Sequence, residues 1–280
     1  MARRRFGDEA RSALAVWAGR LAWFSLVVAA LSVIIVRSAL LEIQPALATF
    51  GAALLFAFFA ILLALLSFIG IWRQGLKGLG SALLAIGIGL ALLAYPAYLG
   101  YRAYRLPAIN DITTDFNDPP RFTVTASMRP RGASYPGKQA ADKQRAAYPD
   151  IEPLQLSVSA QAAFEAAITV ITKRKWLVVD ARAPTPQRRE GTIEAVARTP
   201  IMGFRDDVSI RIRPISGGCR VDVRSASRYG IHDFGANASR VRALTEDIDD
   251  TVSSMPADKR APPEPEKPAP GQRRQPQPRR

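Results

Sequence analysis

The feature that most constrains this 280-residue chain is a set of three long apolar runs within its first 105 residues. They cover residues 17–36, 46–72 and 79–101, and the second and third contain no charged side chain. A helix needs about 20 mostly apolar residues to cross a bilayer. Arg20 interrupts the first run only near its start, where a long side chain can reach the interface. We therefore expect three membrane-spanning helices and not a single soluble globule.

A cleaved signal peptide is the alternative explanation for the first apolar run. The sequence favours a retained helix, because Arg37 is followed almost at once by a second apolar run and not by a polar mature domain. None of the runs contains Asp, Glu, Lys or His, which transporters and proton relays usually place inside the membrane. We therefore predict an anchor. Ser81, Ala85 and Gly89, spaced four apart, allow close helix contact within the chain or between two copies.

Basic residues at alternate ends of these runs predict their orientation. Four arginines precede the first run, and Arg73 and Lys77 separate the second run from the third. In the first loop, by contrast, Arg37 and Glu42 balance each other. Short cytoplasmic loops carry the excess of Lys and Arg. We therefore expect a multi-pass protein of the bacterial inner membrane, with its N-terminus in the cytoplasm and its C-terminal domain in the periplasm.

The net charge of +14 is concentrated in the two ends of the chain. Residues 1–105 hold ten basic and three acidic side chains, residues 106–255 hold 21 and 18, and residues 256–280 hold seven and three. A nucleic-acid-binding protein concentrates its positive charge on the folded module. We therefore expect no nucleic-acid partner, and the basic flanks indicate the lipid bilayer instead. The last segment also contains eight prolines, which predicts a disordered Pro/Arg-rich tail.

The part between the apolar runs and the tail has the patterns of a folded domain. Residues 106–150 contain six prolines and no sustained period, which predicts a connector with an ordered start and a looser stretch over 127–145. Residues 151–255 follow as the domain itself. Its order of strand, helix, four strands and helix predicts an α+β two-layer fold with a mostly antiparallel sheet. The predicted strands cover 154–158, 176–181, 191–199, 207–214 and 219–227, and the helices cover 160–175 and a segment from residue 238.

Alternation along two of these strands sorts charged residues onto the face that points away from the predicted helices. Four arginines occupy this outer face, and Asp222 can face Arg211 or Arg213 across the hairpin, depending on register. The face is either solvated or a docking surface for acidic or phosphate groups. The four arginines are Arg211, Arg213, Arg220 and Arg224.

A second polar group surrounds the end of the last predicted strand. Ser225 and Ser227 lie on its core-facing side, where a hydroxyl without a partner costs roughly 1–3 kcal/mol. Asn237 suits the N-cap of the last helix. We expect one hydrogen-bonded cluster of Asp207, Ser225, Ser227, Arg228, Asp233 and Asn237. With Asp206 and Arg240 these are the candidate binding residues. The cluster either fixes the loop or forms a site where Arg228 or Arg240 holds an anionic ligand.

Four segments carry a resemblance to a known family: INDITTDFNDPPRF (109–122), AAYPDIEPL (146–154), GFRDDVSIRI (203–212) and VDVRSASRYGIHDFGAN (221–237). The chain resembles, over roughly residues 108–250, the bacterial domain-of-unknown-function family numbered 1499 (DUF1499). The resemblance implies a fold and a membrane setting, and it supplies no catalytic residues to transfer.

The sequence leaves two classes of function open. The first is an uncharacterised envelope protein that displays a small periplasmic binding or interaction domain, with an envelope protein or an anionic ligand as partner. The alternative is a hydrolase that uses Ser227, His232 and Asp233, or an enzyme with a carboxylate-bound metal. No Walker loop, GxSxG, HExxH or Rossmann motif is present, so we predict no catalytic residue, cofactor or metal. Cys219 and His232, each single, are too few for a Cys/His zinc site.

Overall fold

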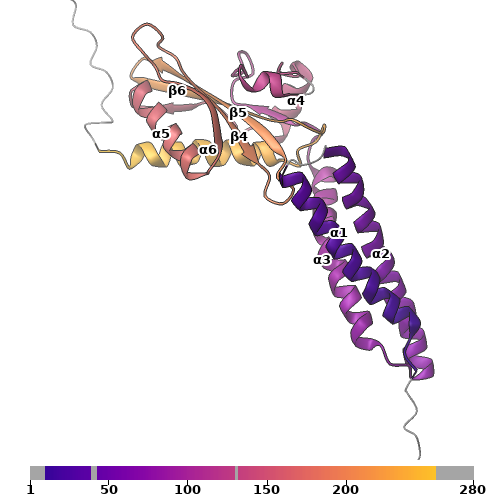
Figure 1. The fold of residues 1–280 in the computed structure, drawn as a ribbon. Helices are drawn as coiled ribbons and strands as arrows, with labels where there is room; N and C mark the ends of the chain where they lie inside the picture. Colours follow the sequence, from indigo (N-terminus) through magenta and orange to yellow (C-terminus); the bar gives the residue numbers. More distant parts are fainter. Residues whose placement is uncertain (1–9, 39–42, 130–131, 257–280) are drawn as a thin grey trace, which may run out of the picture.

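The computed structural model describes residues 10–38, 43–129 and 132–256. Figure 1 shows an elongated molecule in which an α+β domain sits at one end of a bundle of three long helices. The first helix starts at the far end of the bundle and runs toward the domain. The tail predicted to be disordered lies, apart from its first residue, outside the described residues.

The bundle consists of α1 (Ala13–Ser38), α2 (Ile43–Gln74) and α3 (Leu79–Arg105). All three helices are long and apolar enough to cross a membrane, as the three apolar runs predict. Small side chains face inward and large apolar ones face outward, which suits a bundle surrounded by lipid and not by water. The buried core between the helices consists of Ala15, Ala18, Ala22, Ala60, Ala64, Ala82 and Ala85.

The residues spaced four apart on α3 pack against helices of the same chain. Ser81 Oγ donates a hydrogen bond to the carbonyl oxygen of Ala15 at 2.7 Å. A Cβ atom added to Gly89 would lie 2.5 Å from Cγ1 of Ile61 on α2, so only glycine allows this approach. The spacing allowed helix contact either within the chain or between two copies. The structure shows contact within the chain.

The domain is built on one antiparallel sheet, which confirms the predicted fold class. Its strands run in the order β1-β6-β5-β4-β3, and β2 pairs with the other part of β6. Helices α5 (Ala160–Lys173) and α6 (Ala236–Ser253) cover one face. The strands are β1 (Asp111–Thr113), β2 (Leu154–Leu156), β3 (Leu177–Arg182), β4 (Gly191–Arg198), β5 (Arg205–Ile215) and β6 (Gly218–Ser227).

Period-two alternation places the core on the helix-covered face of the sheet. Ile210 and Ile212 on β5 and Val221 and Val223 on β6 are fully buried there against α5 and α6. Ser159 caps α5, because its Oγ accepts a hydrogen bond from the backbone N–H of Ala162 at 3.1 Å.

The segment between α3 and β2 is more structured than its sequence predicts. It contributes β1, a short 3₁₀ helix η1 (Thr125–Met128) and α4 (Lys138–Ala147). The prediction of a looser stretch over 127–145 is therefore wrong in its second half. Figure 1 shows α4 on the side of the sheet away from α5 and α6. The polar sequence of α4 gives little apolar periodicity, and only two of its residues, Ala141 and Gln144, are buried.

Contacts at two points join the domain to the helix bundle. The β4–β5 loop lies against the end of α1, where Met202 packs with Val36 and Ala46. There Nη1 of Arg37 donates a hydrogen bond to the carbonyl oxygen of Pro200 at 2.6 Å. At the second point Nε2 of His232 lies 3.2 Å from the carbonyl oxygen of Leu106, just after α3. The domain is thus held directly against the ends of α1 and α3.

Candidate functional site

The arginine-bearing face of the sheet is covered at Arg211 and Arg224, so the alternative of a solvated face is wrong for these two residues. Arg224 and Asp111 are both buried, and Nε and Nη2 of the arginine donate to the two carboxylate oxygens at 3.0 and 2.7 Å. The rings of Phe122 and Tyr135 lie over the same guanidinium. The chain after β1 therefore lies over this face, and we call it the covering chain. Asp111 neutralises the arginine, and the aromatic rings of the covering chain shield it from solvent.

Three further arginines share three carboxylates on the same face. Asp222 lies opposite Arg211 in the β5–β6 register, which is one of the two pairings that the sequence left open. The other two carboxylates come from the covering chain. Asp115 accepts a hydrogen bond from Arg220 at 2.8 Å, and Asp118 accepts one from Arg211 at 2.7 Å. Because the positive charges are matched one to one, this face offers little excess charge to an anionic ligand.

Burial alone would raise the pKa of the Asp115 carboxyl, but its surroundings reverse the effect. Backbone N–H groups of Asp118 and Asn117 donate to the carboxylate, and Arg220 and Arg211 lie beside it, so the pKa of Asp115 is lowered. The carboxylate is thus ionised at neutral pH and acts as a fixed partner for the arginines.

The candidate residues near the end of β6 form two groups and not one cluster. Asp206 and Asp207 are neighbours on β5, so their side chains point to opposite faces of the sheet. Asp206 faces α6 and accepts a hydrogen bond from Nη2 of Arg240 at 2.5 Å. Asp207 faces the covering chain, where it accepts hydrogen bonds from Arg228 at 2.7 Å and from Arg129 at 2.7 Å.

The first group ties β6 to the start of α6. Ser225 Oγ donates to Oδ1 of Asn237 at 2.7 Å, and Nδ2 of Asn237 donates to Ser227 Oγ at 2.9 Å. The hydroxyl of Ser225, which is fully buried, thus finds the partner that its position requires, and the partly exposed Ser227 joins the same group. Nη1 of Arg240 also donates to Ser225 Oγ at 2.9 Å.

The prediction that Asn237 caps α6 is wrong, because the helix begins at Ala236 and its N-cap position is Gly235, two residues earlier than predicted. The carboxylate of Asp233 takes the capping role, since it accepts hydrogen bonds from the backbone N–H groups of Gly235 and Asn237, both at 2.8 Å. Burial raises the pKa of Asp233, and these two backbone hydrogen bonds oppose the increase.

The structure does not bring Ser227, His232 and Asp233 together as a triad. Nδ1 of His232 accepts a hydrogen bond from the backbone N–H of Phe234 at 2.9 Å, and Nε2 faces the carbonyl oxygen of Leu106. Both ring nitrogens are therefore engaged with backbone, and a serine nucleophile would have no base. Within the described residues no group of three or more His, Cys, Asp or Glu side chains could hold a metal ion.

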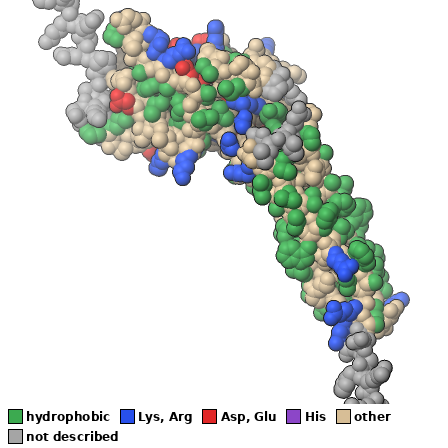
Figure 2. Space-filling view, in the orientation of Figure 1, with side chains coloured by type: hydrophobic (Ala, Val, Ile, Leu, Met, Phe, Trp, Pro, Cys, Tyr) green, Lys and Arg blue, Asp and Glu red, His purple; other side chains and the backbone are tan. Residues whose placement is uncertain are grey.

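A groove of about 770 Å³ lies where β3 and β4 approach the end of α1, and we call it the basic groove. Figure 2 shows Lys and Arg side chains gathered where the domain meets the helix bundle. Six basic and five apolar residues line the groove: Arg37, Arg174, Lys175, Arg198, Arg205, Arg228, Met128, Trp176, Leu177, Val179 and Val196.

The basic groove carries uncompensated positive charge. No acidic residue lines it, and within the described residues only Arg174 and Arg228 have a carboxylate partner, Asp247 and Asp207 respectively. The other four basic side chains have none there, in contrast to the neutralised arginines on the covered face. Their charge is available to an anion, and the apolar residues beside them suit a ligand that also carries an apolar part.

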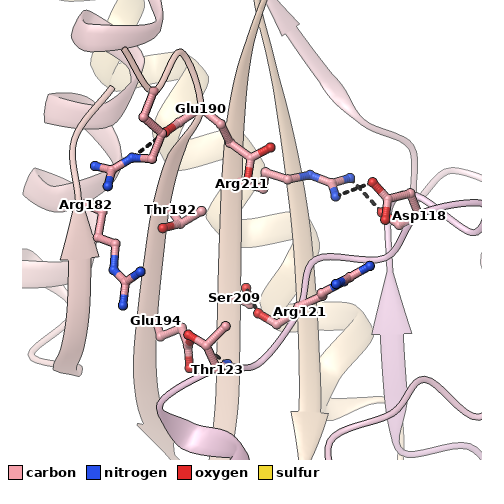
Figure 3. A pocket seen from close by; sticks show the side chains of 10 residues that line it. Asp118, Arg121, Thr123, Arg182, Glu190, Thr192, Glu194, Ser209 and Arg211 are labelled. Atoms are coloured by element: carbon pink, nitrogen blue, oxygen red, sulfur yellow. Dashed lines mark hydrogen bonds and ion pairs between the residues drawn. The ribbon is translucent and has the colours of Figure 1, made fainter. Parts of the chain in front are cut away.

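A second pocket of about 370 Å³ lies on the covered face between β3, β4 and the chain after β1 (Figure 3). It contains four arginines, Arg121, Arg182, Arg188 and Arg211, beside Asp118, Glu190 and Glu194. Glu194 accepts hydrogen bonds from the backbone N–H and the hydroxyl of both Thr123 and Thr125. The acids offset most of the positive charge, so this pocket is a weaker anion site than the basic groove.

Most residues that line the basic groove are not among the candidate binding residues predicted from the sequence. Of the predicted candidates only Arg228 lines it. Lys175 follows the end of α5 in the left-handed conformation (φ 56°) and turns the chain into β3. From sequence, Arg174 and Lys175 read as the basic end of a helix. Arg198 and Arg205 end β4 and begin β5, where they pair directly across the hairpin. In the sequence, the two arginines at the facing ends of these strands were the one feature that could have indicated a basic site here.

Comparison with known proteins identifies the domain and leaves its activity open. Residues 111–248, from the first residue of β1 into α6, match the family described as Protein of unknown function (DUF1499). None of the curated proteins compared with the chain matches it. The match covers both the sheet and the covering chain after β1.

Proposed function

We propose, from the premise that residues 111–248 belong to the DUF1499 family, that this protein is an anchored binding protein of the bacterial inner membrane. Its three helices hold the domain at the periplasmic surface, and the basic groove binds an anionic lipid of the adjacent leaflet. The observation that carries this proposal is the groove itself, in which six basic side chains surround an apolar strip at the end of α1.

The charge balance of the groove supports an anionic ligand. Of its six basic residues, four have no carboxylate partner among the described residues. Each basic side chain near an anionic lipid surface contributes about 1 kcal/mol of attraction. An anionic head group placed between Lys175, Arg198 and Arg205 would replace some of the water that now solvates them.

The apolar residues support a ligand with a hydrocarbon chain. Leu177 is 65% exposed, a large apolar side chain left open to solvent at the edge strand β3. Each buried CH₂ group contributes about 0.8 kcal/mol to binding. Since Arg37 lines the groove from the outer end of α1, a lipid can enter it from the bilayer without crossing water.

Trp176 provides a test that is specific to this groove. It lines the groove, whereas Trp17, Trp23 and Trp72 lie on the membrane helices. With those three replaced by Phe, brominated lipid can quench the remaining fluorescence only by reaching the domain. We expect brominated phosphatidylglycerol to quench Trp176 more than brominated phosphatidylcholine does, with an effect that salt weakens.

Charge variants decide whether the groove is responsible. Arg205→Gln and Lys175→Gln should each weaken the quenching by the anionic lipid about fivefold, the effect of removing one charge worth about 1 kcal/mol. Arg189→Gln is the matched control, since Arg189 is exposed and does not line the basic groove. Equal quenching by both lipids, or an equal loss in the Arg189 variant, would contradict the proposal.

A further inference from the structure

A second groove, of about 740 Å³, lies between α1 and α3 at the end of the bundle away from the domain, and we call it the distal groove. It lies beside the α2–α3 loop, whereas the basic groove is lined by Arg37 at the opposite end of α1. Its lining consists of Arg11, Val16, Gly19, Arg20, Trp23, Lys77, Gly78, Gly80, Ser81 and Leu84.

Backbone hydrogen bonds hold the basic residues of the distal groove together. The N–H of Ser12 donates to the carbonyl oxygen of Lys77 at 2.9 Å, and the N–H of Lys77 donates to that of Ala10 at 3.0 Å. The segment ahead of α1 and the loop ahead of α3 therefore form a two-stranded bridge. The backbones of Arg11 and Lys77 are paired in it, which holds Arg11 at the edge of the groove.

Glycine makes this arrangement possible. Gly78 has a φ of 145°, and a Cβ atom there would lie 2.8 Å from the Cβ of Ala15. A Cβ on Gly19 would lie 2.4 Å from Ser81 Oγ. A Cβ on Gly80, in contrast, would meet nothing within 4 Å, because it would point into open space. The two helices thus touch at the floor of the groove, and the absent side chain of Gly80 leaves room above it.

The charge and the polarity of the lining change along the groove. Arg11, Arg20 and Lys77 are basic, and none of the described residues that line it is acidic. Toward the middle of the bundle the lining becomes apolar, with Trp23 and Leu84 both exposed on the outer surface of the helices. A ligand that matches this lining has an anionic head and an apolar tail that runs parallel to the helices.

We infer that the distal groove binds an anionic phospholipid, with the phosphate of its head group beside Arg11 and Arg20. The acyl chains lie along Trp23 and Leu84 in the bilayer. The inference rests on the membrane helices alone and not on the ligand of the basic groove. In the orientation proposed above, this lipid belongs to the cytoplasmic leaflet.

Native mass spectrometry of the full-length protein in detergent tests this site. Titration with phosphatidylglycerol and with phosphatidylcholine gives the affinity of each bound lipid. We expect the anionic lipid to bind more tightly, and we expect Arg20→Gln to weaken that binding about fivefold. Arg73→Gln is the matched control, because Arg73 is an exposed basic residue near the same end of the bundle that does not line the groove.

A steric variant separates this site from general charge effects. Gly80→Leu should fill the groove without a clash and abolish the preference for the anionic lipid. Gly87→Leu on the same helix also meets open space but lies away from the groove, so it should bind as the wild type does. Equal affinity for both lipids, or equal losses in the paired variants, would overturn the inference. Competition by soluble glycerol phosphate as strong as that by the lipid would also overturn it, because the ligand would then be a free phosphate.

Discussion

Several buried charges of the domain form ion pairs, and the cost of burying them is offset only while both partners are present. Asp111 and Arg224 are the most enclosed example, with side chains 4% and 3% exposed. Cys219 lies in the same strand and provides a probe for such effects. It is fully buried, and burial raises its pKa to about 11, so it reacts with alkylating reagents only when the domain opens. It is the only cysteine of the chain.

Asp111→Asn should destabilise the domain by about 3 kcal/mol, because it removes a charge and leaves the guanidinium of Arg224 buried without a carboxylate. Pulsed alkylation of Cys219 along a urea series measures the free energy of unfolding. Asp142→Asn serves as the control, since Asp142 and Arg145 are exposed and such pairs contribute less than about 1 kcal/mol. Equal small effects of both variants would contradict the assigned role of the buried pair.

Glu194 should make the domain sensitive to acid. Burial opposes its ionisation, but hydrogen bonds from Thr123 and Thr125 outweigh burial and lower its pKa below 4.5. A carboxyl with a lowered pKa in the folded state stabilises the fold above the unfolded pKa and loses that effect as pH falls through the folded pKa. The free energy of unfolding should therefore decrease as the pH is lowered below about 5.

Glu194→Gln should be less stable at pH 7 and show a shallower decrease between pH 5 and pH 3 than the wild type. Circular dichroism along a urea series at each pH measures the slope. Glu152→Gln, at an exposed position, should leave the slope unchanged. A wild-type slope retained in the Glu194 variant would show that other carboxyls dominate.

Among the elements, α4 protects the edge of the sheet at β1. Its Gln144 side chain is fully buried, accepts a hydrogen bond from the backbone N–H of Thr113 at 3.1 Å and donates one to its carbonyl oxygen at 2.7 Å. The side-chain amide thus takes the place of a neighbouring strand. An exposed strand edge is a site for unwanted pairing, and this contact removes it.

Gln144→Ala should destabilise the domain by about 2 kcal/mol or more, because it leaves two buried backbone groups of Thr113 without partners. The measurement is again the urea midpoint of Cys219 alkylation. Gln139→Ala, at an exposed position on the same helix, should change stability by less than about 0.5 kcal/mol. If both variants behave alike, the helix contributes packing and not edge protection.

In the complete protein the domain and the bundle share one orientation, since Arg37 and His232 join the domain directly to α1 and α3. The domain cannot rotate freely on its anchor while these contacts persist. The basic groove therefore stays at the end of the bundle where α1 leaves the bilayer. The topology of the helices then decides which compartment would supply the ligand proposed for it.

A phosphatase fused after Arg105 should be active in the periplasm, and one fused after Lys77 should be silent. The expectation follows from the basic residues ahead of α1 and in the α2–α3 loop, which favour the cytoplasm. Fusions to a reporter that works only in the cytoplasm should give the opposite pattern. Activity after Lys77 and silence after Arg105 would place the domain in the cytoplasm.

Local periodicity fixed much of the architecture before any contact was known. Three apolar runs of spanning length predict α1, α2 and α3, and strict alternation in β5 and β6 predicts the hairpin and limits the partner of Asp222 to Arg211 or Arg213. The structure selects Arg211. Alternation also places Asp206 and Asp207 on opposite faces, so the division of the polar cluster was available from sequence. These features depend on neighbours a few residues apart, and the chain geometry of helices and strands determines them.

The remaining features depend on partners that lie far apart in the chain. Asp111 and Arg224 are 113 residues apart, and no periodicity links a short proline-rich segment to the face that it covers. Helix α4 has almost no apolar stripe, since it buries one amide and not a hydrophobic face. The basic groove likewise joins α1, η1 and four segments around β3 to β6. Packing of distant segments produces these sites, because a side chain's charge partner is set by where the chain folds back and not by its neighbours in sequence.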